Sequence, residues 1–329
     1  MSAEFGVPTD KIKAKVHHIE HHLAHLASAF FVSPFEKAAI ISVDGFGDFV
    51  GAMWGCGEAN KITVKDRVFF PHSLGLFYLA LTQFLGFPKY GDEYKVMGLA
   101  AYGEPEYLQK MKRVVHLDSN GKFRLNLDYF VHHTEGVTMT WDGGEPKLGV
   151  VYSKKMEEDF GPARKNREEP VSKRHEDIAA SLQAMYEEAF FHLLNFVYMQ
   201  TKNPVVCLAG GCAMNSVANG KIFDRTPFKE VYIQAAAGDA GGALGAAYYV
   251  WNQILGKDRS FVMEHAYWGP SFSDGDIEKV LKSKGLELRA CSIQKIENVD
   301  ELCKKTARHI ADGKVVGRFQ GRMEWGPRA

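Results

Sequence analysis

A run of histidines near the amino terminus is the part of the sequence best suited to chemistry. Five histidines fall within nine residues, and on a helix side chains four residues apart lie on one face, where two imidazoles can bind one metal ion. The pairs with this spacing are His17 with His21, His18 with His22, and His21 with His25. Because Glu20 precedes His21 instead of following it, the last pair is not the His-Glu-x-x-His motif of zincins. The apolar neighbours favour a metal site over a surface or capping histidine run, and the spacing leaves all three pairs open.

Two imidazoles rarely hold a catalytic metal alone, so we expect carboxylates to complete the site. Asp44 ends a predicted buried strand, the place where side chains of open α/β folds point into the cleft. Asp239 lies in a glycine-flanked loop before a predicted helix, at the equivalent point of a later unit. Each aspartate alone could equally serve a turn or a helix cap. Two histidines with one or two aspartates and open positions suit Fe(II), Mn(II) or Zn(II).

Three glycine-rich loops follow predicted strands and indicate a nucleotide-binding cleft between two lobes. Glycine lets the backbone approach a phosphate, and a following helix supplies amide donors. The loops are residues 44–48, 210–215 and 238–242. None matches the Walker A or G-x-G-x-x-G pattern, and each alone could be a tight turn. Lys95 could neutralise a phosphate or be an ordinary solvated lysine, and Cys212 is expected to be a packed thiol.

The hydrophobic pattern predicts the elements that would position these residues. The predicted strands are residues 38–44, 49–54, 61–69, 123–127 and 314–319, with two more beginning at Pro204 and Glu230. The predicted helices are residues 16–33, 74–85, 175–198, 243–254, 274–285 and 301–311. Successive strand-loop-helix units are typical of α/β folds, and a change of pattern near residue 260 predicts a domain boundary.

Charge and cysteine usage bound the possible partners. The 40 basic residues balance the 40 acidic ones, so no bulk field favours nucleic acid or an anionic membrane. The five cysteines form no C-x-x-C pair, which favours free thiols in a reducing cytoplasm. The sequence shows no long apolar run and no signal peptide, so we expect a soluble, cytoplasmic protein.

Six stretches spread over nearly the whole chain form a set: residues 21–30, 43–48, 94–103, 210–216, 238–245 and 321–328. Together they resemble the O-carbamoyltransferase family of nodulation-factor and antibiotic-tailoring enzymes, and more distantly the tRNA threonylcarbamoyl transferases. The resemblance implies an actin/hexokinase-like (ribonuclease H-like) nucleotide-binding core over residues 1–260. It also implies the start of an α+β carbamoyl-adenylate-forming (YrdC-like) domain over residues 261–329.

The resemblance also implies roles for single residues. A histidine pair four apart and two aspartates bind iron in the family, and they correspond to His21, His25, Asp44 and Asp239, which selects one of the three pairs. Asp44 and Lys95 become the expected catalytic residues. The expected nucleotide or carbamoyl-adenylate contacts are Gly45, Gly47, Gly103, Gly210, Gly211, Asn215 and Gly238. Arg322 and Arg328 are expected to face carbamoyl phosphate.

The implied reaction has two steps. Carbamoyl phosphate and ATP, with Mg²⁺ as a further candidate ion, give a carbamoyl adenylate in the carboxy-terminal domain. The metal site then polarises this intermediate while a hydroxyl of a sugar-containing or natural-product acceptor attacks. We expect small-molecule partners, no nucleic acid and no membrane, and a homo-oligomer is compatible with the sequence.

The resemblance further implies that the chain is truncated at both ends. The opening strands of the actin-like core and most of the second domain would be absent, so we expect binding of metal and nucleotide without full carbamoyl transfer. Two alternatives stay open from the sequence: a tRNA threonylcarbamoyl transferase-like enzyme, and a non-catalytic actin-fold nucleotide-binding protein.

Overall fold

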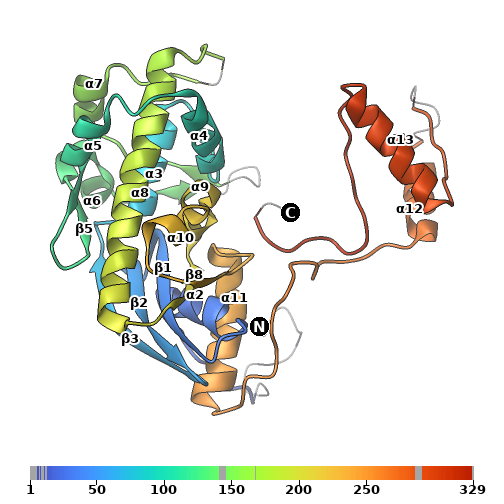
Figure 1. Cartoon of the computed structure of the whole chain (residues 1–329), viewed down its shortest axis with the longest axis horizontal. Coiled ribbons are helices and arrows are strands. Elements are labelled where there is room, and N and C mark those ends of the chain that lie inside the picture. The colour runs from blue at the N-terminus through green and yellow to red at the C-terminus, as the bar shows by residue number, and fades with distance from the viewer. Residues whose placement is uncertain are drawn as a thin grey trace. The chain divides into compact units, whose positions relative to one another are not determined.

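Five strands form the central sheet, and β1 (Lys37–Gly47) is its middle strand (Figure 1). The structure is a computed structural model that describes residues 6, 8, 11, 13–140, 146–166, 168–285 and 291–327. The sheet order is β3 (Lys61–Phe69), β2 (Val50–Glu58), β1, β8 (Val205–Ala209) and β9 (Glu230–Ile233). The pairs β1–β2 and β2–β3 are antiparallel, whereas β1–β8 and β8–β9 are parallel. This mixed sheet, with helices on its faces, confirms the predicted α/β class.

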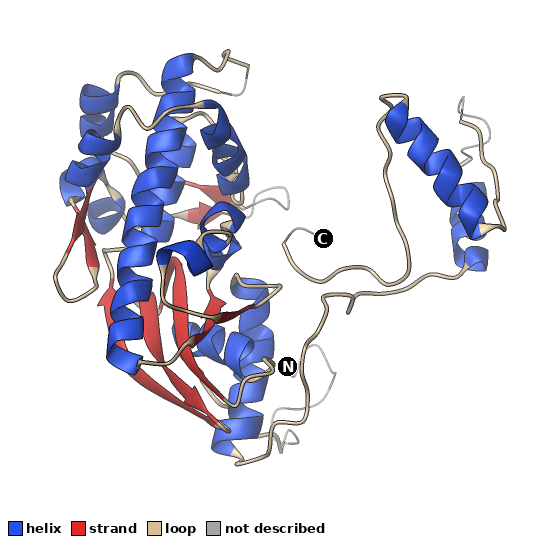
Figure 2. Cartoon of the chain, in the orientation of Figure 1, coloured by secondary structure: helices blue, strands red, loops and turns tan. Residues whose placement is uncertain are grey.

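Side chains of β1 alternate between two hydrophobic clusters, because successive residues of a strand point to opposite faces. Ile41 and Val43 belong to the cluster that includes α3 (Leu74–Phe84) and α8 (Lys173–Thr201). Ala38 and Ile40 belong to the cluster that includes α2 (His21–Phe30). Helices therefore cover both faces of the sheet (Figure 2), which explains why the sequence of β1 is a nearly continuous apolar run.

Helix α2 is shorter than the predicted helix over residues 16–33. It begins at His21, after Glu20, whose carboxylate accepts hydrogen bonds from the backbone N–H groups of His22 and Leu23 at 3.1 and 2.7 Å. These bonds satisfy amides of the first turn that have no partner inside the helix. The prediction was therefore wrong at the amino end, and residues 16–20 lie outside the helix.

Helix α11 (Asp239–Tyr248) packs against α2 at very short range. A Cβ added to Gly245 would lie 1.8 Å from the carbonyl oxygen of Ala24 and 2.8 Å from the backbone nitrogen of Ser28. Glycine is needed here because the two backbones touch. The predicted helix over residues 243–254 is thus present, and it continues as the π-helix η6 (Tyr249–Ile254).

The remaining elements surround this core. The predicted helices over residues 74–85 and 175–198 and the strand over residues 61–69 are confirmed as α3, α8 and β3. Short antiparallel pairs are β4 (Val115–Leu117) with β5 (Phe123–Leu125) and β6 (Met139–Thr140) with β7 (Lys147–Leu148). The other helices are α4 (Glu93–Leu99), η2 (Ala100–Tyr102), α5 (Leu108–Val114), η3 (Leu127–Tyr129), α6 (His132–Glu135), α7 (Lys154–Phe160), η5 (Gly211–Met214), α9 (Ser216–Asn219) and α10 (Ile222–Arg225).

The chain divides into two compact units, Met1–Met263 and Glu264–Ala329. In the second unit the predicted helices are present as α12 (Asp274–Ser283), capped by Ser273, and α13 (Val299–Ala311). The strand predicted at residues 314–319 is wrong, because a strand needs a partner and the described residues of this unit offer it none. None of the described residues after Met263 is buried.

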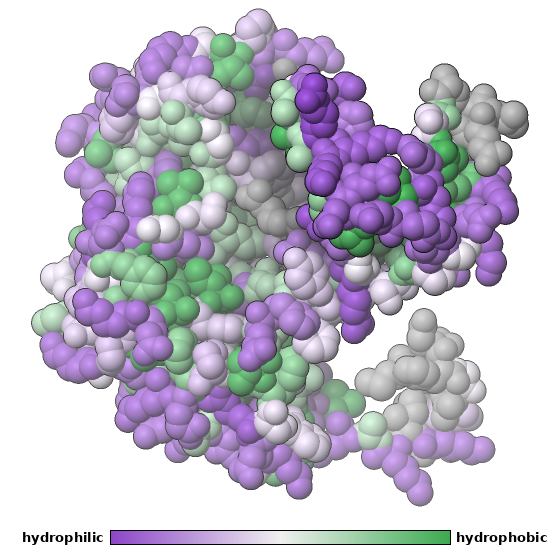
Figure 3. Space-filling model, turned by 45° about the vertical axis from the view of Figure 1, so that its right-hand side comes forward, coloured by the Kyte–Doolittle hydropathy of each residue, from purple (hydrophilic) through white to green (hydrophobic). Residues whose placement is uncertain are grey.

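The helices that the structure describes include no candidate membrane span. None of these helices combines the length and the apolar composition needed to cross a bilayer. Hydrophilic side chains cover much of the face shown in Figure 3, with apolar side chains in patches between them.

Candidate metal centre

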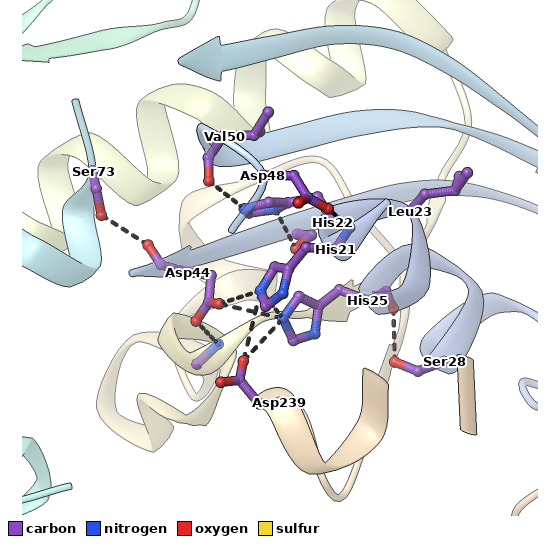
Figure 4. Close-up of polar contacts among 12 residues, drawn as sticks. His21, His22, Leu23, His25, Ser28, Asp44, Asp48, Val50, Ser73 and Asp239 are labelled. Atoms are coloured by element: carbon purple, nitrogen blue, oxygen red, sulfur yellow. Dashed lines mark hydrogen bonds and ion pairs between the residues drawn. The ribbon is translucent and has the colours of Figure 1, made fainter. Parts of the chain in front are cut away.

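Two imidazoles of α2 and two carboxylates converge on one point (Figure 4). The Nε2 atoms of His21 and His25 are 3.1 Å apart. Asp44 Oδ2 lies 3.0 Å from the first and 3.3 Å from the second, and Asp239 Oδ1 lies 3.6 and 3.7 Å from them. All four ligand atoms lie within 4.8 Å of one another. The structure therefore brings together the four residues predicted as metal ligands.

The spacing of these atoms fits a bound cation. Bonds of about 2.0–2.2 Å to nitrogen and oxygen place neighbouring ligand atoms about 2.8–3.6 Å apart at angles between those of an octahedron and a tetrahedron. Four of the five separations given above, 3.0 to 3.6 Å, fall within this range, and the fifth, 3.7 Å, lies just above it. Every one of the four atoms can offer a lone pair, and with neutral imidazoles the set carries two negative charges. A divalent cation satisfies all four at once, and this nitrogen and oxygen set suits Fe(II), Mn(II) or Zn(II).

Asp44 reaches the centre because β1 loses its neighbours at this residue. Pairing with β8 ends at Ser42, and the register with β2 breaks after Val43. The carboxylate is then held on both sides: Oδ1 accepts the backbone N–H of Gly211 at 2.8 Å, and Oδ2 faces the histidines. Burial alone would raise the pKa of Asp44, but these hydrogen bonds hold it well below its usual range. The group is therefore an anion, as a metal ligand must be.

His25 is fully buried beneath the centre. Burial alone would lower its pKa, but the carboxylates of Asp239 and Asp44 outweigh it and raise the pKa to about 9. Its Nδ1 has no hydrogen-bond partner in the described structure, whereas metal-bound histidines usually donate from the second nitrogen. The ring is thus held from the side of the centre, where Nε2 points.

His21 is positioned by the hairpin between β1 and β2. Its backbone N–H donates to Asp48 Oδ2 at 2.8 Å. Its ring lies so close to Gly47 that an added Cβ would meet Cγ of the imidazole at 2.1 Å. The turn itself is made by Asp48 and Phe49, with φ of 47° and 62°. The hairpin predicted here is present, but the chain turns later than predicted, because Gly45 and Gly47 belong to β1 and the loop of residues 44–48 is mostly strand.

His22 belongs to the core and not to the centre. It is buried, with Nε2 donating to the carbonyl oxygen of Val50 at 2.7 Å and Nδ1 lying 2.9 Å from the hydroxyl of Ser42. Burial is the main reason why the pKa of His22 falls to about 4, so the ring is neutral. The pair of His18 with His22 is excluded, and because residues 17–20 are not helical, His17 does not share a helix face with His21.

The loop at residues 210–215 contacts Asp44 through the backbone N–H of Gly211. Helix α8 holds this loop: the hydroxyl of Tyr186 donates to the Cys212 carbonyl at 2.8 Å. The side-chain amides of Gln183 and Asn215 donate to each other at 3.1 and 3.0 Å, and Asn215 Oδ1 also accepts the N–H of Ala218. Asn215, a predicted nucleoside contact, is thus engaged within the protein. These supports were missed because the partners lie far apart in the sequence and share no motif.

Other predicted residues lie in protein contacts of their own. Lys95, a predicted catalytic residue on α4, forms an ion pair with Asp92 at 2.5 Å. Gly103 packs on α8, since an added Cβ would lie 2.0 Å from the carbonyl oxygen of Glu176. Gly238 precedes α11 as its N-cap residue and so places Asp239 in the first turn.

The remaining glycine and arginines complete the predicted set. Gly210 has φ of 87° and touches the carbonyl of Val43, so it brings the loop against β1. Arg322 donates to the backbone carbonyls of Gly269 and Trp268 within the second unit, at 2.9 and 3.3 Å. Arg328 lies outside the described residues.

A recess opens beside the centre. It has a volume of about 390 Å³ and contains two of the ligands, His21 and Asp239. Its other lining residues are Ile19, Ala24, Asp48, Gly242 and Ala246. The small side chains of α2 and α11 leave this space open, so molecules from solvent can approach the centre here.

The fold and site define an α/β protein with a candidate metal centre built from two histidines and two aspartates. The chain belongs to the carbamoyltransferase family, since the family model described as carbamoyltransferase N-terminus matches residues 2–248. That match contains all four ligands and all five strands of the sheet.

Several proteins are similar to nearly the whole chain. An uncharacterized protein of Synechocystis (sll1178) is 42% identical over 94% of this chain and 48% of that protein. The nodulation protein NolNO of Sinorhizobium fredii is 35% identical over 100% of this chain and 44% of that protein, and NolO of Bradyrhizobium diazoefficiens is 34% identical over 94% and 52%. The chain thus spans about half the length of these relatives. The solved structure of T. kodakarensis HypF covers 75% of this chain and 38% of that one, at 14% identity and a TM-score of 0.38 that is too low to bear on the fold.

Proposed function

We propose that this chain carries the metal-dependent transfer site of an O-carbamoyltransferase. The proposed reaction moves a carbamoyl group from carbamoyl phosphate, through an ATP-derived carbamoyl adenylate, to a hydroxyl of a sugar-containing or natural-product acceptor. Membership of the carbamoyltransferase family supports a transferase. The observation that carries the proposal is the convergence of four ligand atoms beside a recess open to solvent.

Each residue of the centre has a defined part in this proposal. His21 and His25 would offer Nε2 lone pairs, and Asp44 and Asp239 would offer carboxylate oxygens to Fe(II), or alternatively to Mn(II) or Zn(II). When bound, such a cation supplies Lewis-acid stabilisation of the negative charge that develops on the transferring group. The Gly211 amide keeps Asp44 Oδ2 turned towards the histidines by holding Oδ1. Burial of His25 keeps water away from the inner side of the centre.

We further propose that the first unit is a ribonuclease H-like half of an actin/hexokinase-like core that uses ATP with Mg²⁺. The strand order supports this proposal, because a three-stranded antiparallel meander continued by two parallel strands beside its first strand is the sheet of such halves. Residues 264–329 would begin the carbamoyl-adenylate-forming domain. Because the relatives are about twice as long, the complete reaction is a proposal for the whole protein.

Metal analysis tests the centre. We expect purified protein reconstituted with Fe(II) under argon to hold one transition-metal ion per chain by mass spectrometry. The His21→Ala, His25→Ala double variant should lose it. His116→Ala is the matched control, because His116 is an exposed histidine of β4 outside the centre. Metal retention by the double variant equal to that of the wild type would contradict the proposed ligands.

An activity assay tests the chemistry separately. Full-length protein with ATP, carbamoyl phosphate and a sugar acceptor should form a carbamoylated product detectable by mass spectrometry. Chelation should abolish product formation, and Fe(II) should restore it. Turnover that survives complete removal of the metal would reject the role assigned to the centre.

A further inference from the structure

The candidate centre is accessible from one side. His25 is fully buried, and the side chain of Asp44 is only 13% exposed. His21 and Asp239 are exposed to 27% and 64% on the opposite side. An ion that enters or leaves this site must therefore pass these two residues.

Two adjoining recesses lie on the accessible side. The recess that contains His21 and Asp239 shares Ile19, Asp48 and Ala246 with a second recess of about 670 Å³. The second recess is lined also by His17, His18 and Glu20. The segment that precedes α2 thus forms the outer part of the approach to the centre.

The lining of this approach suits a cation. Three acidic residues, Glu20, Asp48 and Asp239, line the two recesses, and no lysine or arginine among the described residues lines either one. The carboxylates of Glu20 and Asp48 also accept backbone N–H groups of α2. Walls of one sign of charge raise the local concentration of oppositely charged ions. His17 and His18 add imidazoles, which bind first-row transition metals. Neither belongs to the four-residue ligand set, and neither lies on α2.

We propose that His17 and His18 form a transient capture site through which divalent transition-metal ions reach and leave the centre; this rests on the proposed metal-binding function. The outer imidazoles replace the first water molecules of a hydrated ion. The four inner ligands then take the ion from them. An ion held in the adjoining recess is available to the final site at an effective concentration in roughly the millimolar range, as for other tethered partners.

Metal exchange kinetics test the proposal. Apoprotein is mixed with Co(II) in a stopped-flow instrument, and uptake is followed by the visible absorbance of the complex. Release is followed by transfer of Co(II) to excess EDTA. For the His17→Ala, His18→Ala double variant we expect the rate constants of uptake and release both to fall about tenfold. This factor is at the low end of what electrostatic steering supplies. The dissociation constant should stay unchanged, since a path used in both directions alters rates and not equilibrium.

His116→Ala serves as the control for loss of a surface histidine, and circular dichroism verifies that the variants are folded. Uptake and release equal to those of the wild type would overturn the capture site. A higher dissociation constant with an unchanged rate constant of uptake would also overturn it, because His17 and His18 would then be ligands of the final complex. If the wild-type protein itself takes up no Co(II), the proposed metal-binding function is refuted together with the capture site. If only the effect of the double variant is absent, the capture site alone is refuted.

Discussion

At the scale of single residues, the centre depends on places where a side chain is missing. Gly47 lets the imidazole of His21 lie against the hairpin, and Gly211 brings a backbone amide to Asp44. An added Cβ would lie 2.1 Å from the first ring and 2.8 Å from Oδ1 of the aspartate. Both glycines were predicted as nucleotide contacts, and in the structure they lie against His21 and Asp44, two of the candidate metal ligands.

The hairpin offers a matched pair of substitutions. Gly47→Ala should displace His21 and weaken Co(II) binding at least about tenfold, equivalent to roughly 1.4 kcal/mol. Gly45→Ala should leave the affinity unchanged, because a Cβ at Gly45 has no atom within 4 Å. Isothermal titration of both variants measures the difference. Equal affinities would show that the close approach of Gly47 to the ring has no part in binding.

The sequence alone predicted the kinds of ligand but could not choose among the histidines. Helical spacing allowed three pairs, and the resemblance to a family selected one. The physical choice is made by contacts distant in sequence: Ser42 and Val50 hold His22 in the core, and Glu20 starts the helix too late to include His17. Such contacts leave no local pattern, so only the folded chain reveals them.

At the scale of elements, three segments meet at the centre: α2, the end of β1 and the start of α11. Helix α2 is fixed at its carboxyl end by Arg259, whose guanidinium donates to the carbonyls of Phe31, Ser33 and Phe35 and lies over the ring of Phe30. These bonds satisfy carbonyls that follow the helix. With Glu20 at the other end, the histidine pair sits on a helix held at both termini.

The packing of α11 on α2 makes a second prediction. Gly245→Ala would push α11 away from backbone atoms of α2, which cannot yield, and so carry Asp239 away from the histidines. We expect weaker metal binding and a free energy of unfolding lower by about 1–3 kcal/mol, as in other overpacked interiors.

Gly242→Ala is the control on the same helix, because a Cβ there has no atom within 4 Å. It should raise the free energy of unfolding by about 0.5–1 kcal/mol, as glycine is a poor helix former. Urea denaturation and Co(II) titration compare the two variants. An undisturbed metal affinity in Gly245→Ala would show that α11 can shift without moving Asp239.

Elements with a strong periodic pattern were predicted well. Segments that become a strand only when another strand pairs with them were not. β1 and α8 carry long apolar patterns and appear where expected. Residues 314–319 have a strand-like composition, yet no neighbouring backbone in the described part of their unit pairs with them. Composition records what a segment can do, whereas pairing depends on the rest of the chain.

At the scale of the whole molecule, the candidate metal centre lies entirely within one unit. All four ligands and both hydrophobic clusters precede Glu264. The last residue of the unit, Met263, is buried, and it bonds to Val32 and Tyr232 through its backbone. The first unit thus has a core and a site of its own.

A chain that ends at residue 263 should therefore keep its fold and its metal affinity. We expect a cooperative thermal transition by circular dichroism. The Co(II) dissociation constant should equal that of the longer chain within about twofold, a difference much smaller than the tenfold change that corresponds to about 1.4 kcal/mol. A loss of affinity would assign part of the site to residues 264–329. Aggregation of the shortened chain would show that the first unit depends on the second.

The convergence of three distant segments also has a consequence for the stability of the fold. A cation bound by His21, His25, Asp44 and Asp239 would join the beginning of the first unit to its end, as a covalent cross-link does. Unlike a covalent cross-link, the ion leaves the unfolded chain unrestricted, and because it binds only the folded state it stabilises that state by about 2.7 kcal/mol at a hundredfold excess over its dissociation constant. The four candidate metal ligands would thereby also form a reversible cross-link of the folded chain. The resistance of the protein to heat and proteolysis would then depend on the supply of metal.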